Sequence, residues 1–413
     1  MIHNQPEEVT DWATDFDHGS QEWADNPYSI VESLKNSGCP IAHTQRYGGA
    51  WLPVTYDLIK EIALDTKNFS SEGTVVRKIK PYEHNVFSTK TPAPVGVMPP
   101  ISSDPPFHKI ARSLLAPFFS LDASELWRDE ISSVCSSLIS EIDNKSSVDI
   151  MDKYAKKIPS KIIQKMLGIP EQDVQKFNDW INFFVHTIDE LPNKERVLTY
   201  LKYRKYITNH INSHIENPKD DFITHLLKCE ISGEPLSMEH LIGTISIIIV
   251  AGIHTVSSVI GSSLWHLATN SVDRRRLVEN PDMIPAAVEE FLRAYAPITM
   301  ARLVKEDMEF HGVQMKKEDW VLLPFPAANR DDKQFANAHE VIIDRKENRH
   351  VAFGLGIHRC LGSNLARLEM NVAVEVFLKR FPDFSVDANE MVTWSTGQVR
   401  GPRTLPFVVN ARA

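Results

Sequence analysis

A ten-residue stretch near the C-terminal end, FGLGIHRCLG at residues 353–362, restricts the possible folds of this chain more than any other segment. It places Cys360 among three glycines, directly after two basic residues. The apolar residues that follow recur at helical spacing, at Leu361, Leu365, Leu368, Val372 and Val376. Cys360 is therefore expected at the start of a helix, where free N–H groups and partial positive charge favour a thiolate over a thiol.

The commonest interpretation of a single cysteine in such a loop is a small buried residue. The four cysteines of the chain are widely spaced, which argues against a disulfide framework or a zinc site and favours a reducing compartment: Cys39, Cys135, Cys229 and Cys360. A lone thiolate held by backbone N–H groups suits one axial bond to a haem iron better than a multi-ligand metal site. The glycines would let the backbone approach a flat group closely.

The full pattern F-G-x-G-x-H-x-C-x-G resembles the haem-binding signature of the cytochromes P450, and every fixed position is present. The resemblance implies the P450 fold, which is mainly α with small β-sheets (α+β), with haem b between a long central helix and the cysteine loop. It further implies that Cys360 is the axial ligand of the haem iron. Phe353, Gly354 and Gly362 would contact the haem, and His358 would lie near a haem propionate.

A second basic segment, DPPFHKIAR at residues 104–112, begins with two prolines that favour a helix start. His108 and Arg112 then share one helical face, which suits a pair of carboxylates, although a solvated basic face is the plainer alternative. The segment is similar to the P450 segment whose His and Arg hold the haem propionates. Arg302 resembles the further propionate-binding arginine of the family.

The longest helical candidate, residues 237–268, is apolar on most faces, as a helix in a protein core would be. Its centre matches the family's A-G-x-(acid)-T at Ala251, Gly252 and Thr255, where the resemblance implies a widening that admits O2. His254 stands where the family usually has an acid. Since imidazole can relay protons near neutral pH, we expect Thr255 to hydrogen-bond bound O2 and His254 to replace the acid. The alternative is that His254 is an ordinary core histidine.

Glu290 and Arg293 are spaced to pair on one helical face. Such a pair is usually a surface ion pair of little energetic worth. In the P450s this E-x-x-R motif is a buried structural lock with a later arginine, a role that Arg345 fits, although three residues just before Arg345 depart from the family pattern.

The resemblance also assigns a substrate pocket. It draws on an irregular, proline-rich loop over residues 78–101, on an aromatic cluster near residue 184, on the central helix and on a turn near the C-terminus. A plain surface loop or a plain core residue is the alternative at each position. The candidates are Val97, Met98, Ile101, Phe184, Ile247, Val250, Ile298, Thr299 and Trp394.

One domain over residues 1–413 is the simplest division of the chain, because no linker or repeat interrupts it, and residues 1–20 are expected to be flexible. The net charge of −9 argues against nucleic-acid binding. The N-terminus lacks the features of a signal peptide, and the apolar run at residues 241–253 is too short to span a bilayer. We therefore expect a cytoplasmic protein with no membrane contact.

Taken with these features, the chain resembles the soluble bacterial P450s. Residues 46–53 and 99–112 are also similar to the haem domains of self-sufficient P450s, but no fused reductase follows, so a separate ferredoxin and ferredoxin reductase are expected. The resemblance implies a monooxygenase that uses O2 to hydroxylate or O-dealkylate a small organic substrate. Two alternatives stay open: a haem-thiolate enzyme of the peroxygenase, isomerase or nitric-oxide-reductase type, and a haem-binding sensor without turnover.

Overall fold

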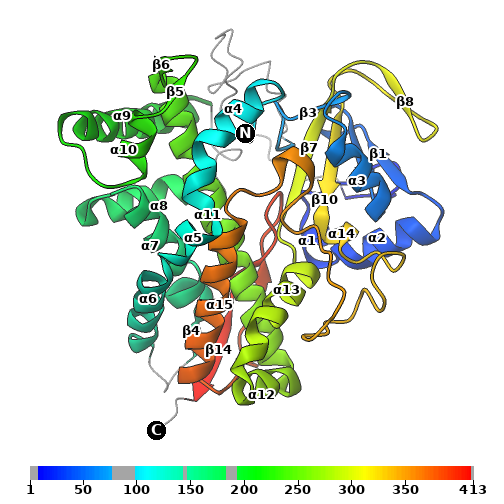
Figure 1. Cartoon of the computed structure of the whole chain (residues 1–413). Helices are drawn as coiled ribbons and strands as arrows, with labels where there is room; N and C mark the ends of the chain where they lie inside the picture. The colour runs from blue at the N-terminus through cyan, green and yellow to red at the C-terminus, as the bar shows by residue number, and fades with distance from the viewer. Residues whose placement is uncertain (1–7, 77–97, 143–146, 183–192, 411–413) are drawn as a thin grey trace.

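The computed structural model describes residues 8–76, 98–142, 147–182 and 193–410, and it is mainly helical with small sheets, as predicted (Figure 1). Its helices are α1 (Gln21–Asp25), α2 (Pro27–Asn36), α3 (Tyr56–Leu64), α4 (Phe107–Leu115), α5 (Leu121–Glu125), α6 (Arg128–Ser140), α7 (Lys157–Met166), α8 (Val174–Asn182), α9 (Asn193–Glu216), α10 (Phe222–Leu227), α11 (Met238–Thr269), α12 (Ser271–Glu279), α13 (Ile284–Ala294), α14 (Phe325–Ala328) and α15 (Ser363–Arg380).

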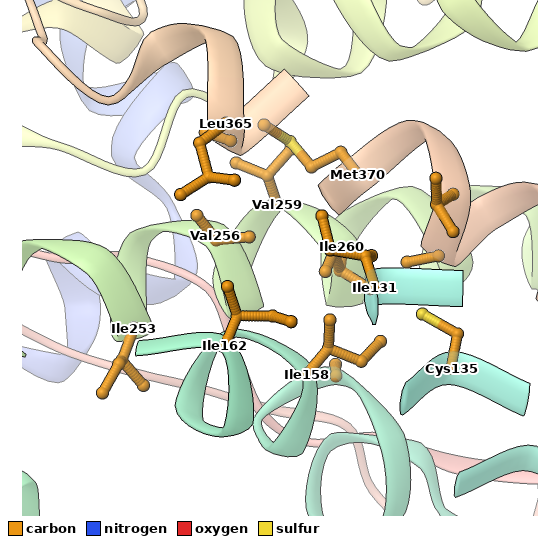
Figure 2. Packing of buried hydrophobic residues seen from close by; sticks show 14 of the residues in the cluster. Ile131, Cys135, Ile158, Ile162, Ile253, Val256, Val259, Ile260, Leu365 and Met370 are labelled. Carbon is orange, nitrogen blue, oxygen red and sulfur yellow. The ribbon is translucent and has the colours of Figure 1, made fainter. Parts of the chain in front are cut away.

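Helix α11 runs through the centre of the larger hydrophobic cluster, as its apolar pattern predicted. The hydroxyl of Ser237 caps its start by accepting the N–H of His240 at 3.2 Å. Figure 2 shows four α11 residues packed between two residues of α7 and two of α15: Ile253, Val256, Val259 and Ile260, with Ile158 and Ile162, and Leu365 and Met370. The burial of each such side chain contributes about 1.5–3 kcal/mol to the stability of the folded state. These contacts hold α11 at the centre of the fold.

The helix that contains the apolar run at residues 241–253 is longer than that run, because α11 continues to Thr269. Among the described helices, α11 has the length and mean hydropathy (1.9 over its most apolar window) of a membrane span, and 61% of that window is buried inside the protein. Burial against α7 and α15 accounts for the apolar sequence of a core helix.

The largest sheet has the strand order β1-β2-β10-β7-β3 and forms a second, smaller hydrophobic cluster with α1, α2 and α3. The sheet's strands are β1 (Ile41–Thr44), β2 (Ala50–Pro53), β3 (Phe69–Ser70), β7 (Thr299–Val304) and β10 (Trp320–Pro324). Arg302, in the middle of β7, pairs with Val321 of β10. The remaining strands are β4 (Val148–Asp149), β5 (Glu230–Ile231), β6 (Glu234–Pro235), β8 (Met308–Phe310), β9 (Val313–Met315), β11 (Asp383–Val386), β12 (Thr393–Trp394), β13 (Pro402–Thr404) and β14 (Pro406–Asn410).

The N-terminal segment differs from its predicted flexibility over residues 8–20. Phe16 is fully buried, the N–H of His43 in β1 donates to the carbonyl of Ala13 at 2.9 Å, and Arg46 pairs with Asp15 at 2.8 Å. The polar, acidic composition of this segment did not indicate that a buried aromatic residue, a main-chain hydrogen bond and ion pairing hold it to the sheet.

Glu290, Arg293 and Arg345 meet as the sequence predicted. Arg293 donates two hydrogen bonds of 2.8 Å to the Glu290 carboxylate, and Arg345 Nε lies 3.0 Å from Glu290 Oε2. Arg293 Nη1 also donates to the carbonyls of Asn329 and Ala338 at 2.8 and 2.7 Å. This cluster joins α13 to the long irregular segment that leads to the Cys360 loop.

Candidate functional site

The Cys360 loop is held by its own backbone. The N–H of Cys360 donates to the carbonyl of Phe353 at 2.7 Å, and Gly354 and Gly356 have φ of +70° and +64°, values that L side chains rarely adopt. Helix α15 begins three residues after Cys360, with Gly362 at its N-cap. The predicted position at a helix start is therefore correct.

Burial raises the pKa of the Cys360 thiol, although the Gly362 N–H and the guanidiniums of Arg112 and Arg359 act in the opposite direction. The predicted thiolate is thus not stabilised by the helix start and the arginines alone. A positive partner that binds the sulfur directly would deprotonate it, as metal ions do with thiols. The Cys360 thiol can be reached by such a partner, because the residue is exposed even though the surrounding protein groups desolvate the sulfur.

Basic side chains from three separate elements gather beside this loop. The imidazoles of His108 (α4) and His358 lie with centroids 4.2 Å apart. Arg302 is 5% exposed and donates to the carbonyl of Ala301 at 2.7 Å. Arg112 donates to the carbonyl of Arg359 at 2.7 Å, so α4 is tied directly to the cysteine loop.

This cluster is short of acidic partners. In the part of the chain that the structure describes, His108 Nε2 is buried without a hydrogen-bond partner, and no carboxylate lies within ion-pair distance of Arg302. Asp104, which acts on both groups, is itself paired with Lys305 at 2.9 Å. Burial lowers the pKa of Arg302 to about 10. Two carboxylates, such as the propionates of a haem, would fit this set of donors.

The centre of α11 is accessible although both of its flanks are buried. Ala251 is exposed and Thr255 is half-buried, whereas Ile249 and Ile253 are buried. The Thr255 hydroxyl donates to the Ala251 carbonyl one turn earlier at 2.8 Å. The accessible surface on the central helix, the exposed Cys360 and the unpaired basic cluster together fit a flat dianionic group such as haem.

Gly252 has a packing reason that the sequence did not reveal. A Cβ at this position would lie 2.8 Å from Ile163 Cδ1 on α7, so a larger residue would require the Ile163 side chain to move. His254 is half-buried, and its carbonyl accepts the Ser257 hydroxyl at 3.1 Å.

The pocket candidates fall into three groups. Val97 and Phe184 lie outside the described residues. Six others are buried or half-buried on α11, on β7 or beside it, or just before α4: Ile247, Val250, Ile298, Thr299, Met98 and Ile101.

Trp394 lies elsewhere, since its ring contacts Trp265 at 5.3 Å and Arg400 stacks over it at 4.3 Å. Trp265 follows Thr255 by ten residues, or about 15 Å of helix, so these contacts do not support a place for Trp394 in the pocket.

Two further residues support the site and escaped the sequence analysis. Ser71 Oγ lies 2.9 Å from His358 Nε2 and so orients that ring. Glu289 binds Arg367 of α15 and His350 of the loop, at 2.6 and 3.0 Å. Burial would raise the pKa of Glu289, but these two hydrogen bonds and the positive charges outweigh it and lower the pKa to about 2. No local pattern marks either residue, because their partners are distant in the sequence.

Comparisons with known proteins show the family and the fold of the chain. A family model described as Cytochrome P450 matches residues 174–393. The chain is 32% identical to the polyketide biosynthesis cytochrome P450 PksS of Bacillus subtilis (strain 168), over 94% of this chain and 97% of the relative. The solved structure of PksS superposes with a TM-score of 0.84 at 30% identity and covers 95% of this chain and 99% of that one.

Two other relatives carry names that describe chemistry. The vitamin D(3) 25-hydroxylase of Pseudonocardia autotrophica is 29% identical over 89% of both chains. The structure of CYP109E1 from Bacillus megaterium in complex with testosterone has a TM-score of 0.84 at 27% identity and covers 95% of this chain and 100% of that one.

Proposed function

The chain belongs to the cytochrome P450 family of haem monooxygenases, and we propose that it uses O2 to hydroxylate or O-dealkylate a neutral, apolar organic molecule. One observation gives the strongest support for a haem site in this chain. Within the described residues, a buried imidazole nitrogen of His108 has no hydrogen-bond partner and the buried Arg302 has no carboxylate partner, and both lie beside an accessible cysteine. Haem b supplies these partners at once and, when bound, the chemistry that activates O2.

The chain's own groups have distinct roles in this proposal. Cys360 would hold the haem iron through its thiolate sulfur, with Phe353, Gly354 and Gly362 around the cofactor. The propionates are held by a larger set of basic groups: His108, Arg112, Arg302 and His358. Because burial already lowers the pKa of Arg302 and of His108, an added dianion restores the charge balance of the cluster.

Proton delivery falls to Thr255 with His254. The Thr255 hydroxyl keeps its proton on the Ala251 carbonyl, a bond from which it can rotate toward the active-site side of α11. His254, which precedes Thr255 in the chain, is half-buried, and its imidazole can take up and release a proton near neutral pH. We expect His254→Phe to release more hydrogen peroxide per NADH consumed than wild type, with Ser257→Ala as a control on the same helix. Equal coupling in His254→Phe and wild type would exclude this relay.

The substrate is proposed to be apolar because the described pocket candidates carry no charge: Met98, Ile101, Ile247, Val250, Ile298 and Thr299. The relatives support a bulky molecule, since one hydroxylates vitamin D3, another was solved with testosterone and a third serves polyketide biosynthesis. A ferredoxin with its reductase is the proposed electron source, with Arg112, Arg359 and Arg367 on the cysteine side for an acidic partner. The proposed location is the cytoplasm.

The carbon-monoxide difference spectrum of the reduced protein tests the central assignment. We expect a strongly red-shifted Soret band in wild type, its loss in Cys360→Ser and its retention in Cys229→Ser. Oxygen uptake that depends on NADH, ferredoxin and an added steroid would then support the oxygenase. Turnover with hydrogen peroxide alone would instead favour the peroxygenase. An unshifted band in folded wild-type protein would contradict thiolate ligation by Cys360.

A further inference from the structure

A second candidate site lies away from the Cys360 loop. A hollow of about 430 Å³ opens between the first turn of α4, the β5–β6 hairpin and the first turn of α11. Figure 1 shows α4 and the β5–β6 hairpin at the same end of the molecule. None of the predicted haem or substrate residues lines this hollow.

The walls of the hollow are apolar and well fixed. Phe107 is buried, Ile110 is 40% exposed at the rim, and Ile231 and Leu236 are half-buried. The hairpin that carries Ile231 closes through a two-residue turn whose φ values are +57° and +83°, the tight geometry that suits β-hairpins. The hollow is thus bounded by two helix ends and a rigid turn, and its volume is in the range of small-molecule sites.

A single imidazole forms the polar part of its buried wall. His240 is 4% exposed, lines the hollow and packs against the Phe107 ring with centroids 5.8 Å apart. Across the described residues, no hydrogen bond to the His240 ring is formed. The Ser237 hydroxyl, which also lines the hollow, is occupied in capping α11. The His240 side chain is therefore almost fully buried as a whole, yet its ring nitrogens keep some exposed surface and have no hydrogen-bond partner among the described residues.

We propose that this hollow binds a neutral, apolar molecule that carries one hydroxyl, with the hydroxyl bound to the His240 imidazole. The apolar walls contact the carbon skeleton, and the ring nitrogen provides the one directional contact. Burial lowers the pKa of His240 to about 4, so the ring is neutral at pH 7 and does not attract an anion. Glu234 at the exposed rim also disfavours anions.

The matched pair 2-naphthol and naphthalene tests this site, because the two probes differ by one hydroxyl. Equilibrium dialysis against the holoenzyme counts bound probe, and the Soret spectrum reports separately on the haem pocket. We expect wild type to bind one 2-naphthol that is silent in the Soret spectrum, about five- to tenfold more tightly than naphthalene. His240→Leu is expected to remove this preference and His240→Gln to retain it.

If His240→Leu does not fold, Ile110→Glu provides a second test of the same site. Its side chain is at the rim, so the variant is expected to fold, to lose the silent site for both probes and to keep the Soret response. Val272→Glu, at an exposed apolar position on α12 (58% exposed), is the control that should keep both. Equal affinity of the two probes in wild type, or a silent site that survives Ile110→Glu, would overturn the proposal.

This preference has one consequence that rests on the proposed function. Monooxygenation converts an apolar molecule into the same molecule with a hydroxyl, so the hollow would favour the product over the substrate. The dialysis experiment needs no turnover. Loss of the silent site with an intact carbon-monoxide spectrum would therefore reject this site alone, whereas an unshifted spectrum would reject the proposed function alone.

Discussion

Two buried clusters of basic side chains in this protein are balanced in different ways. Around Glu290, the carboxylate accepts hydrogen bonds from Arg293 and Arg345, and main-chain carbonyls take the remaining donors. Around His108 and Arg302, the described residues offer no carboxylate that pairs with either group. Because an unpaired buried charge is unfavourable, the first cluster stabilises the fold, and the second is explained by a ligand that brings negative charge. Four changes test this difference.

The largest effect is expected from Glu290→Ala, which would convert the balanced cluster into an unbalanced one. Two buried guanidiniums would lose their counter-charge, a change of about 3–5 kcal/mol in the free energy of unfolding. Urea unfolding followed by circular dichroism measures it. Glu61→Gln, which breaks the exposed ion pair with His311, should change stability by less than about 1 kcal/mol. Similar effects of the two substitutions would refute the distinction.

Glu369 on α15 is a third case, a buried acid whose Oε2 has no hydrogen-bond partner in the described residues. Burial raises its pKa from 4.5 to about 8. The folded protein therefore holds this proton more tightly than the unfolded chain does. Below pH 4.5 the group has no effect, and between pH 4.5 and 8 the folded state loses stability as pH rises.

Glu369→Gln should remove this pH dependence and stabilise the protein by about 3 kcal/mol at pH 7, with no gain near pH 4. Unfolding curves at several pH values, with Glu375→Gln on the same helix as control, measure the effect. A gain that is independent of pH would show that Glu369 is ionised in the folded state or paired.

Arg302→Gln is expected to act in opposite directions with and without haem. The haem-free protein should be as stable as wild type or more so, because an unpaired buried charge is removed. Haem affinity should fall about tenfold or more, as expected for losing a charged hydrogen bond. Haem transfer to apomyoglobin measures the affinity, and Arg128→Gln on the surface is the control. A variant that loses apoprotein stability but keeps haem affinity would make Arg302 structural.

The smallest effect is expected from Ser71→Ala, which removes the partner of His358 Nε2 without changing any charge. We expect a loss of about 1 kcal/mol in stability. Thermal unfolding is a sufficient measurement, and Ser113→Ala, at an exposed position on α4, serves as the matched control. A loss of stability as large as that expected for Glu290→Ala would mean that neutral and charged hydrogen-bond partners contribute equally to the stability of this protein.

The sequence predicted the features that depend on neighbouring residues. The periodic apolar run marked α11, the glycines and the helical pattern after Cys360 marked the loop and α15, and E-x-x-R spacing marked Glu290 with Arg293. These predictions agree with the structure because periodicity, turn residues and i,i+3 spacing are local properties of a chain.

Other features were decided by contacts between distant segments. The sequence could not indicate that Ser71 reaches His358, that Gly252 lies close to Ile163, or that Trp394 packs against Trp265. The sequence also could not indicate that Phe16 is buried, because that burial depends on segments distant in the chain.

Local motifs that resemble those of the family therefore indicated which residues would bind a haem, whereas tertiary structure alone decided which of them lack partners. Cys360, His108 and Arg302 match motifs along the chain, but only the structure shows that, among the described residues, His108 and Arg302 are buried without a carboxylate that pairs with them. The His240 hollow is the same kind of feature, since three elements must meet before its imidazole is enclosed. The physical reason is that the requirement for a partner arises from desolvation, and desolvation is a property of packing and not of sequence order.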